Sequence, residues 1–153
     1  MINLLIGDPF TELIDGQALE QAALAALQHQ DAPTDSDLSL VIEDDARLHE
    51  LNKQFLDVDA PTDVLSFPSG EEEPDPETGN LYLGDIIISY PRALEQSQAA
   101  GHSVLDELRL LVVHGVLHLL GHDHAEPEEK ATMWAAQSEI LRGLGAQITR
   151  LPE

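Results

Sequence analysis

Three histidines in the C-terminal third of the chain have the spacing of an open metal site. His114 and His118 are four residues apart in a segment of helix-compatible aliphatic residues. On a helix, both imidazoles would leave the same face, about 6 Å apart along the axis. Gly121 can end that helix in a left-handed conformation, and the resulting turn would bring in His124 as a third ligand. Three protein ligands plus a water are the pattern of a catalytic zinc rather than a structural one.

The competing interpretation is that these histidines are ordinary buried residues. Five of the seven histidines lie between residues 102 and 124. Burying several imidazoles in an aliphatic helix without a metal would leave polar nitrogens unpaired, at about 1 to 3 kcal/mol each. We therefore predict one zinc ion per chain, although imidazole sites also accept nickel, copper or iron. The predicted ligands are His114, His118 and His124.

The residues next to these ligands are expected to have other roles. His102 and His122 lack the phase of the other three histidines, so we expect them near the ligands or on the surface. Asp123 stands between two histidines and either holds an imidazole N–H beside the metal or is solvated. The general base cannot be assigned from the sequence.

The residue after the first histidine narrows the reaction class. The spacing also occurs in zinc peptidases, where this position is a glutamate that takes the proton from the metal-bound water. Here it is Gly115, which has no side chain. Three neutral imidazoles also leave the full charge of the ion on the site, which suits an anionic substrate. Phosphodiester hydrolysis is therefore favoured over peptide hydrolysis.

Four segments resemble one known family. Residues 114–124, His-Gly-Val-Leu-His-Leu-Leu-Gly-His-Asp-His, are similar to the signature of the YbeY family of ribosomal RNA maturation endoribonucleases, with His122 where a tyrosine is common. Residues 51–68, residues 83–89 and a tail helix with Met133 and Glu139 resemble the other hallmarks, in the same order. The resemblance implies zinc-dependent cleavage of single-stranded RNA, in 3′-end maturation of small-subunit (16S) ribosomal RNA and in ribosome quality control. It also implies the small subunit or its assembly proteins as partners.

One position departs from the family. The family usually has an arginine where this chain has Leu56, and leucine cannot clamp a phosphate. Arg92, Lys53 or Arg109 are candidates to replace it. Two alternatives to the ribonuclease therefore stay open: a non-catalytic ribosome assembly factor stabilised by zinc, and, with less support, a zinc peptidase.

The charge of the chain is unusual for a protein that acts on RNA. Its 153 residues carry a formal charge of −22, from 7 Lys and Arg against 29 Asp and Glu, and the acidic stretch 71–77 is the densest part. This is opposite to the usual basic footprint of nucleic-acid binding. We expect salt to screen the repulsion, so activity should tolerate or prefer a salty medium. With no cysteine, no signal-like N-terminus and no long apolar run, we expect a cytoplasmic protein without membrane contact.

Periodicity predicts the elements that position the histidines. We expect strands at 1–6, 38–43, 64–67 and 81–90. We expect helices near 16–29, from 45 through Phe55, near 91–100 and 104–120, and from 126 onward. The segment 104–120 is apolar nearly all round, which indicates burial at the centre of the protein. The chain should form a single α+β domain over 1–153, with a small mixed sheet and helices packed around this metal-binding helix.

Overall fold

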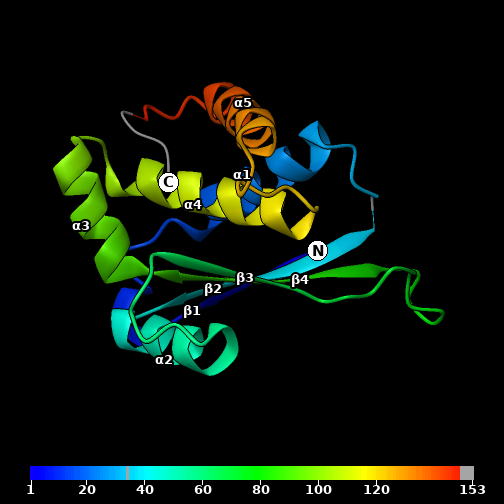
Figure 1. Cartoon of the computed structure of the whole chain (residues 1–153), viewed down its shortest axis with the longest axis horizontal. Coiled ribbons are helices and arrows are strands. Elements are labelled where there is room, and N and C mark those ends of the chain that lie inside the picture. The colour runs from blue at the N-terminus through cyan, green and yellow to red at the C-terminus, as the bar shows by residue number, and fades with distance from the viewer. Residues whose placement is uncertain (34, 149–153) are drawn as a thin grey trace.

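Four strands in the described part of the chain form one mixed sheet. The computed structural model describes residues 1–33 and 35–148. Strands β1 (Ile2–Ile6), β2 (Ser36–Glu43) and β4 (Leu81–Ser89) run parallel, and β3 (Val64–Pro68) pairs antiparallel with β4. The spatial order is β1-β2-β4-β3, which places β3 at an edge (Figure 1). Every second residue of β2 is buried, as expected for a strand that packs one face on the core.

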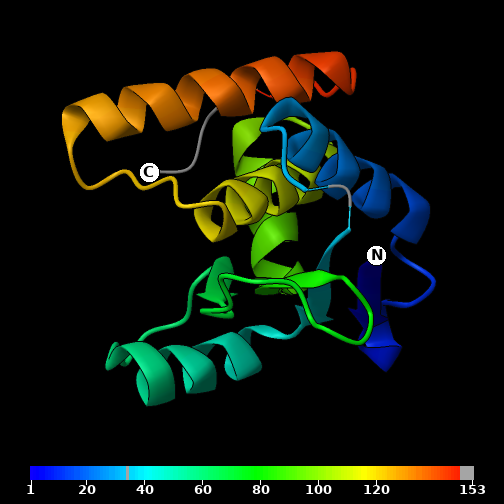
Figure 2. The same ribbon diagram turned by 90° about the vertical axis from the view of Figure 1, so that its right-hand side faces the viewer.

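Helices cover the two faces of the sheet unequally. Helix α2 (Asp45–Leu56) lies alone on one face, where Leu48 and Leu51 pack with Leu65 and Ile87 of the strands. The opposite face carries the larger core, and Figure 2 shows its helices in successive layers above the sheet. These helices are α1 (Gly16–His29), α3 (Tyr90–Ala100), α4 (Val104–Leu119) and α5 (Pro127–Gly143). A short 3-10 helix, Asp8–Phe10, follows β1.

Helix α4 is the centre of the larger core. It contacts α1, α3, α5, β3 and β4. Every residue from 110 to 117 is buried, which agrees with the apolar character of the segment on all sides. The helix begins after Ser103, whose side chain accepts a hydrogen bond from the backbone N–H of Asp106. The predicted fold class, a single α+β domain around a buried central helix, is thus confirmed.

No helix within residues 1–33 and 35–148 is both long and apolar enough to cross a membrane.

Candidate metal centre

Helix α4 brings the first two histidines together. His114 is buried and His118 is partly buried, one turn further along the helix. Their Nε2 atoms are 3.1 Å apart, and their ring centroids are 4.6 Å apart. Because a buried helix packed on all sides cannot easily shift, both imidazoles are held at a fixed separation.

A glycine turn supplies the third histidine. Gly121 has a φ of +99°, and the N–H groups of Gly121 and His122 bond to the carbonyls of His118 and Leu117, both at 3.0 Å. This is a Schellman motif, in which a left-handed residue satisfies the last carbonyls of the helix. The chain then turns back, and the ring of His124 lies 5.1 Å from that of His118 between centroids. The three candidate ligand nitrogens all lie within 4.8 Å of one another.

The other nitrogen of each helical histidine is held by an oxygen. The Nδ1–H of His114 donates to Oε1 of Gln137 on α5 at 2.9 Å, and the Nδ1–H of His118 donates to the backbone carbonyl of His122 at 2.9 Å. With the protons on Nδ1, both Nε2 atoms present lone pairs to each other. Such an arrangement is repulsive unless a cation lies between them.

The donor set fits a zinc ion. A tetrahedral ion with Zn–N bonds of 2.0 to 2.1 Å separates two ligand nitrogens by roughly 3.3 Å, close to the 3.1 Å between the two Nε2 atoms. Metal-ligating histidines usually donate their second N–H to an oxygen, as His114 and His118 do. Three imidazoles leave a fourth position of such a centre for a water or substrate.

Burial keeps the first two imidazoles neutral. Desolvation, followed by the neighbouring His118, lowers the pKa of His114 to about 4. Desolvation is also the main cause of the lowered pKa of His118. Only the neutral imidazole can bind a metal, so both groups are in the binding form at neutral pH.

Gln137 was not recognised from the sequence as part of the site. It is fully buried on α5, on the face that also carries Met133, Ile140 and Leu141. A polar residue at the centre of an otherwise apolar helix face needs a buried partner, and this was the available signal.

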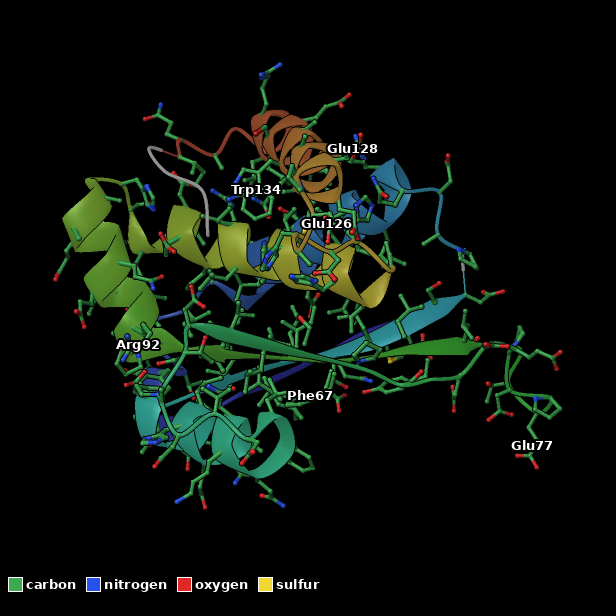
Figure 3. The ribbon with its side chains drawn as sticks, viewed as in Figure 1. Phe67, Glu77, Arg92, Glu126, Glu128 and Trp134 are labelled. Atoms are coloured by element: carbon green, nitrogen blue, oxygen red, sulfur yellow. The ribbon has the colours of Figure 1, made fainter. Side chains whose placement is uncertain are left out.

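Trp134 closes one side of the centre. Its ring lies edge-on to His114 and His124, with centroid separations of 5.8 and 5.6 Å. Figure 3 shows the side chain of Trp134 between α5 and α4. Nζ of Lys130 lies over the same ring, 5.4 Å from its centroid. Trp134 therefore packs against the histidines and shields the site from solvent.

The remaining residues singled out in this segment have other partners. The Asp123 carboxylate accepts a hydrogen bond from the backbone N–H of His124 at 2.7 Å, so it fixes the loop that carries the third histidine. Nε2 of His122 contacts Oε1 of Gln30 at 2.6 Å. His102 lies before α4 and is buried against Glu107, 2.6 Å away.

An open cavity of about 780 Å³ lies over the three histidines. Its walls come from the end of α2, from α3, and from β3 with the turn before it, including Thr62, Asp63 and Ser66. Leu56 lines it too, with 53% of its surface exposed. Of the three cations considered as replacements for the family arginine, Arg92 lines the cavity, whereas Lys53 and Arg109 are not among its lining residues.

The helix approaches the sheet closely at Gly115. A Cβ atom at this position would lie 2.7 Å from Cγ2 of Ile86 on β4. The side of the helix that would carry a peptidase glutamate therefore faces the sheet and has no room for a side chain. This packing explains the glycine and argues further against the zinc peptidase alternative.

Asp85 is an acidic residue in an otherwise isoleucine-rich strand, where a buried carboxylate needs a partner and a role close to the site is expected from the sequence. The structure does not place it near the histidines. It alternates with Gly84 and Ile86, which face the core, so its side chain points to the opposite face of the sheet. There it accepts a hydrogen bond from the hydroxyl of Tyr82.

An α+β domain whose central helix presents converging imidazoles beneath an open cavity is the arrangement expected of a metal-dependent hydrolase. Comparison with known proteins defines the family more closely. The model of the family described as Endoribonuclease YbeY matches residues 11–145. The chain therefore belongs to the endoribonuclease YbeY family, as its motifs indicated.

Similar proteins agree with this assignment over most of their length. Endoribonuclease YbeY of Dehalococcoides mccartyi strain CBDB1 is 42% identical over 151 residues, covering 92% of this chain and 91% of the relative. Endoribonuclease YbeY of Roseiflexus sp. strain RS-1 is 41% identical over 148 residues, covering 94% of this chain and 92% of the relative. The solution structure of TM1509 from Thermotoga maritima matches with a TM-score of 0.64 and 27% identity, covering 94% of this chain and 89% of that one.

Proposed function

We propose that this protein is a zinc-dependent, single-strand-specific endoribonuclease that holds one zinc ion with His114, His118 and His124. The observation that carries the proposal is the convergence of two Nε2 atoms, 3.1 Å apart, on the floor of the cavity. Family membership supports RNA as the substrate, because the relatives are named endoribonucleases. We further propose the 3′ end of small-subunit (16S) ribosomal RNA as the target, ribosome quality control as the process, and the cytoplasm as the location.

The bound ion would polarise a phosphodiester oxygen and lower the pKa of a coordinated water toward about 7. The protein's own residues prepare this centre. Gln137 and the carbonyl of His122 fix the proton of each helical imidazole on Nδ1, which points both Nε2 atoms at the site. Trp134 and the surrounding apolar helix limit access of water from the core side, which strengthens electrostatic interactions there.

The acidic charge of the chain is partly directed away from the cavity. The loop between β3 and β4, which carries Glu77, extends beyond the sheet, at the opposite end of the molecule from Arg92 (Figure 3). Glu126 and Glu128, in contrast, lie at the start of α5, close to the loop of the third histidine. Approach of an RNA strand is therefore opposed by local as well as overall charge, and screening by salt should assist it.

Cleavage of a single-stranded RNA by highly purified protein with stoichiometric zinc tests the proposal. We expect the wild-type protein to cut the RNA across a salt series and a His114→Ala variant to be inactive at every salt concentration. Isothermal titration should show one zinc per wild-type chain. Equal activity of the two proteins would exclude this site as the source of cleavage.

The same experiment addresses the alternative of a non-catalytic assembly factor, which Leu56 at the cavity and the charge of −22 favour. In that case the wild type would bind zinc with a gain in melting temperature and yet show no turnover. Interaction with ribosomal small-subunit proteins would then be the next property to measure.

A further inference from the structure

Within residues 1–33 and 35–148, Arg92 is the only Lys or Arg that lines the cavity of the three histidines. It lies in the first turn of α3, directly after β4 ends at Ser89, and 31% of its side chain is exposed. Figure 3 shows it at the base of α3, next to the beginning of α2. A nucleic-acid strand in this cavity would therefore meet one fixed positive side chain in addition to the metal.

The guanidinium of Arg92 is held in a defined orientation. Nε donates to Oδ1 of Asp45 at 2.9 Å, and Nη2 donates to Oδ2 at 3.0 Å. The hydroxyl of Ser89 donates to Oδ1 of the same carboxylate at 3.1 Å. This fork uses two of the five N–H groups of the guanidinium, and it leaves Nη1 and one N–H of Nη2 to a further acceptor.

The register of β3 separates Arg92 from the histidines along the cavity. At one end, the carbonyl of Asp63 accepts a hydrogen bond from the backbone N–H of Ser89, the residue at the N-cap of α3. At the other end, the hydroxyl of Ser66 donates to the carbonyl of Gly115, next to His114. The two ends are three residues apart on an extended chain, roughly 10 Å at 3.4 Å per residue. The backbones that carry Arg92 and His114 therefore meet this wall at separate points, and a strand that lies along it would present different phosphates to them.

We infer that Arg92 binds a backbone phosphate of the single-stranded nucleic acid at a nucleotide flanking the bond that is cut at the histidines. The inference rests on the proposed function, because it assumes that a nucleic-acid strand occupies the cavity. It would explain how a chain with leucine at position 56 positions its substrate: the phosphate contact is made from α3 instead of α2.

A purely structural role for the ion pair makes a different prediction. If Arg92 only ties α3 to α2, removing either partner should have the same consequence. If Arg92 contacts a phosphate, Asp45→Asn removes a competing negative charge and keeps one side-chain oxygen that still accepts a guanidinium N–H, so Arg92 stays in the cavity. Asp45→Asn should then leave nucleic-acid binding unchanged or tighter, whereas Arg92→Gln should weaken it.

The test compares zinc-loaded wild type, Arg92→Gln, Asp45→Asn and a control, Arg47→Gln. Arg47 is on α2, outside the cavity, and its Nη1 lies 3.4 Å from Oε2 of Glu50 in an exposed pair. Arg47→Gln therefore changes the net charge by the same amount as Arg92→Gln. Affinity for a single-stranded oligodeoxyribonucleotide, which keeps the phosphates but is not cut by a ribonuclease, is measured by fluorescence anisotropy across a salt series. Values of kcat and KM are measured on an RNA of the same sequence.

We expect Arg92→Gln to weaken binding about tenfold, as loss of a charge-assisted hydrogen bond does. The slope of log affinity against log salt concentration should become less steep by about 0.7, which is the contribution of one phosphate contact on a single strand. KM should rise more than kcat falls. Arg47→Gln and Asp45→Asn should show no such loss.

Two results with the variants would overturn the inference. If Arg92→Gln binds like Arg47→Gln, Arg92 makes no phosphate contact. If Asp45→Asn weakens binding as much as Arg92→Gln, the ion pair only ties α3 to α2. Wild type that binds the oligonucleotide but cuts no RNA would refute the proposed activity alone, and the role of Arg92 would still be decided by the binding data. Wild type that neither binds nor cuts would refute both.

Discussion

Replacing Gly115 by alanine should destabilise the protein, although alanine is normally the better helix residue. In an exposed helix interior this change would stabilise by up to about 1 kcal/mol. Here the new methyl group would lie 2.7 Å from Cγ2 of Ile86 and 3.1 Å from both its Cγ1 and Cδ1. Overpacking of a core usually costs about 1 to 3 kcal/mol. We therefore expect a net loss of about 1 to 2 kcal/mol in the free energy of unfolding.

The control for this prediction is Gly143→Ala, a helical glycine whose added Cβ would meet no heavy atom within 4 Å. Urea unfolding of the metal-free proteins should show Gly143→Ala at or above wild-type stability. In an Ile86→Ala background, which removes all three crowding atoms, Gly115→Ala should become neutral or stabilising. Zinc affinity should fall in the single Gly115→Ala variant, because a displaced α4 carries His114 with it. The reasoning is refuted if Gly115→Ala and Gly143→Ala have equal effects, or if the Ile86→Ala background changes nothing.

The remaining predictions concern the histidines. Because burial lowers the pKa of His114 from 6.5 to about 4, the stability it contributes to the metal-free protein is complete above pH 6.5 and is lost as the pH falls toward 4. The loss should amount to about 3 kcal/mol in the free energy of unfolding. Urea unfolding of His114→Gln should lack that part of the pH dependence, and parallel stability–pH curves for the variant and the wild type would contradict the prediction. Gln137→Leu should lower zinc affinity about 10- to 100-fold by titration, whereas Gln98→Leu on the exposed face of α3 should not. Gly121→Ala, at a φ of +99°, should cost about 1 to 2 kcal/mol and weaken zinc binding, and full retention of both would argue against the role of the turn.

Local sequence signals were sufficient for the elements and for the convergence of the three histidines. The spacing of His114, His118, Gly121 and His124 depends on one helix and one turn, which short-range rules describe well. The expected helix 104–120 differs by one residue from the observed Val104–Leu119. The apolar character of this helix on all sides correctly indicated its central position.

Contacts between distant elements were not accessible in the same way. The partnership of Gln137 with His114 depends on how α5 crosses α4, which no local pattern specifies. The position of Arg92 at the cavity depends on the order of the strands, since α3 begins where β4 ends. Asp85 is a different case. Because neighbouring residues of a strand point to opposite faces, its position between Gly84 and Ile86 was enough to place it on the face of the sheet away from the histidines.

The three candidate ligands differ in how firmly the protein holds them, and this bears on the kinetics of metal exchange. His114 and His118 belong to the buried helix α4, whereas His124 lies on the loop that follows the glycine turn, outside the helix. Release of an ion should therefore begin at His124, because its loop can move without displacing α4. The residence time of the ion would be governed by the opening rate of residues 121–126, and its affinity by the rigidity of the core.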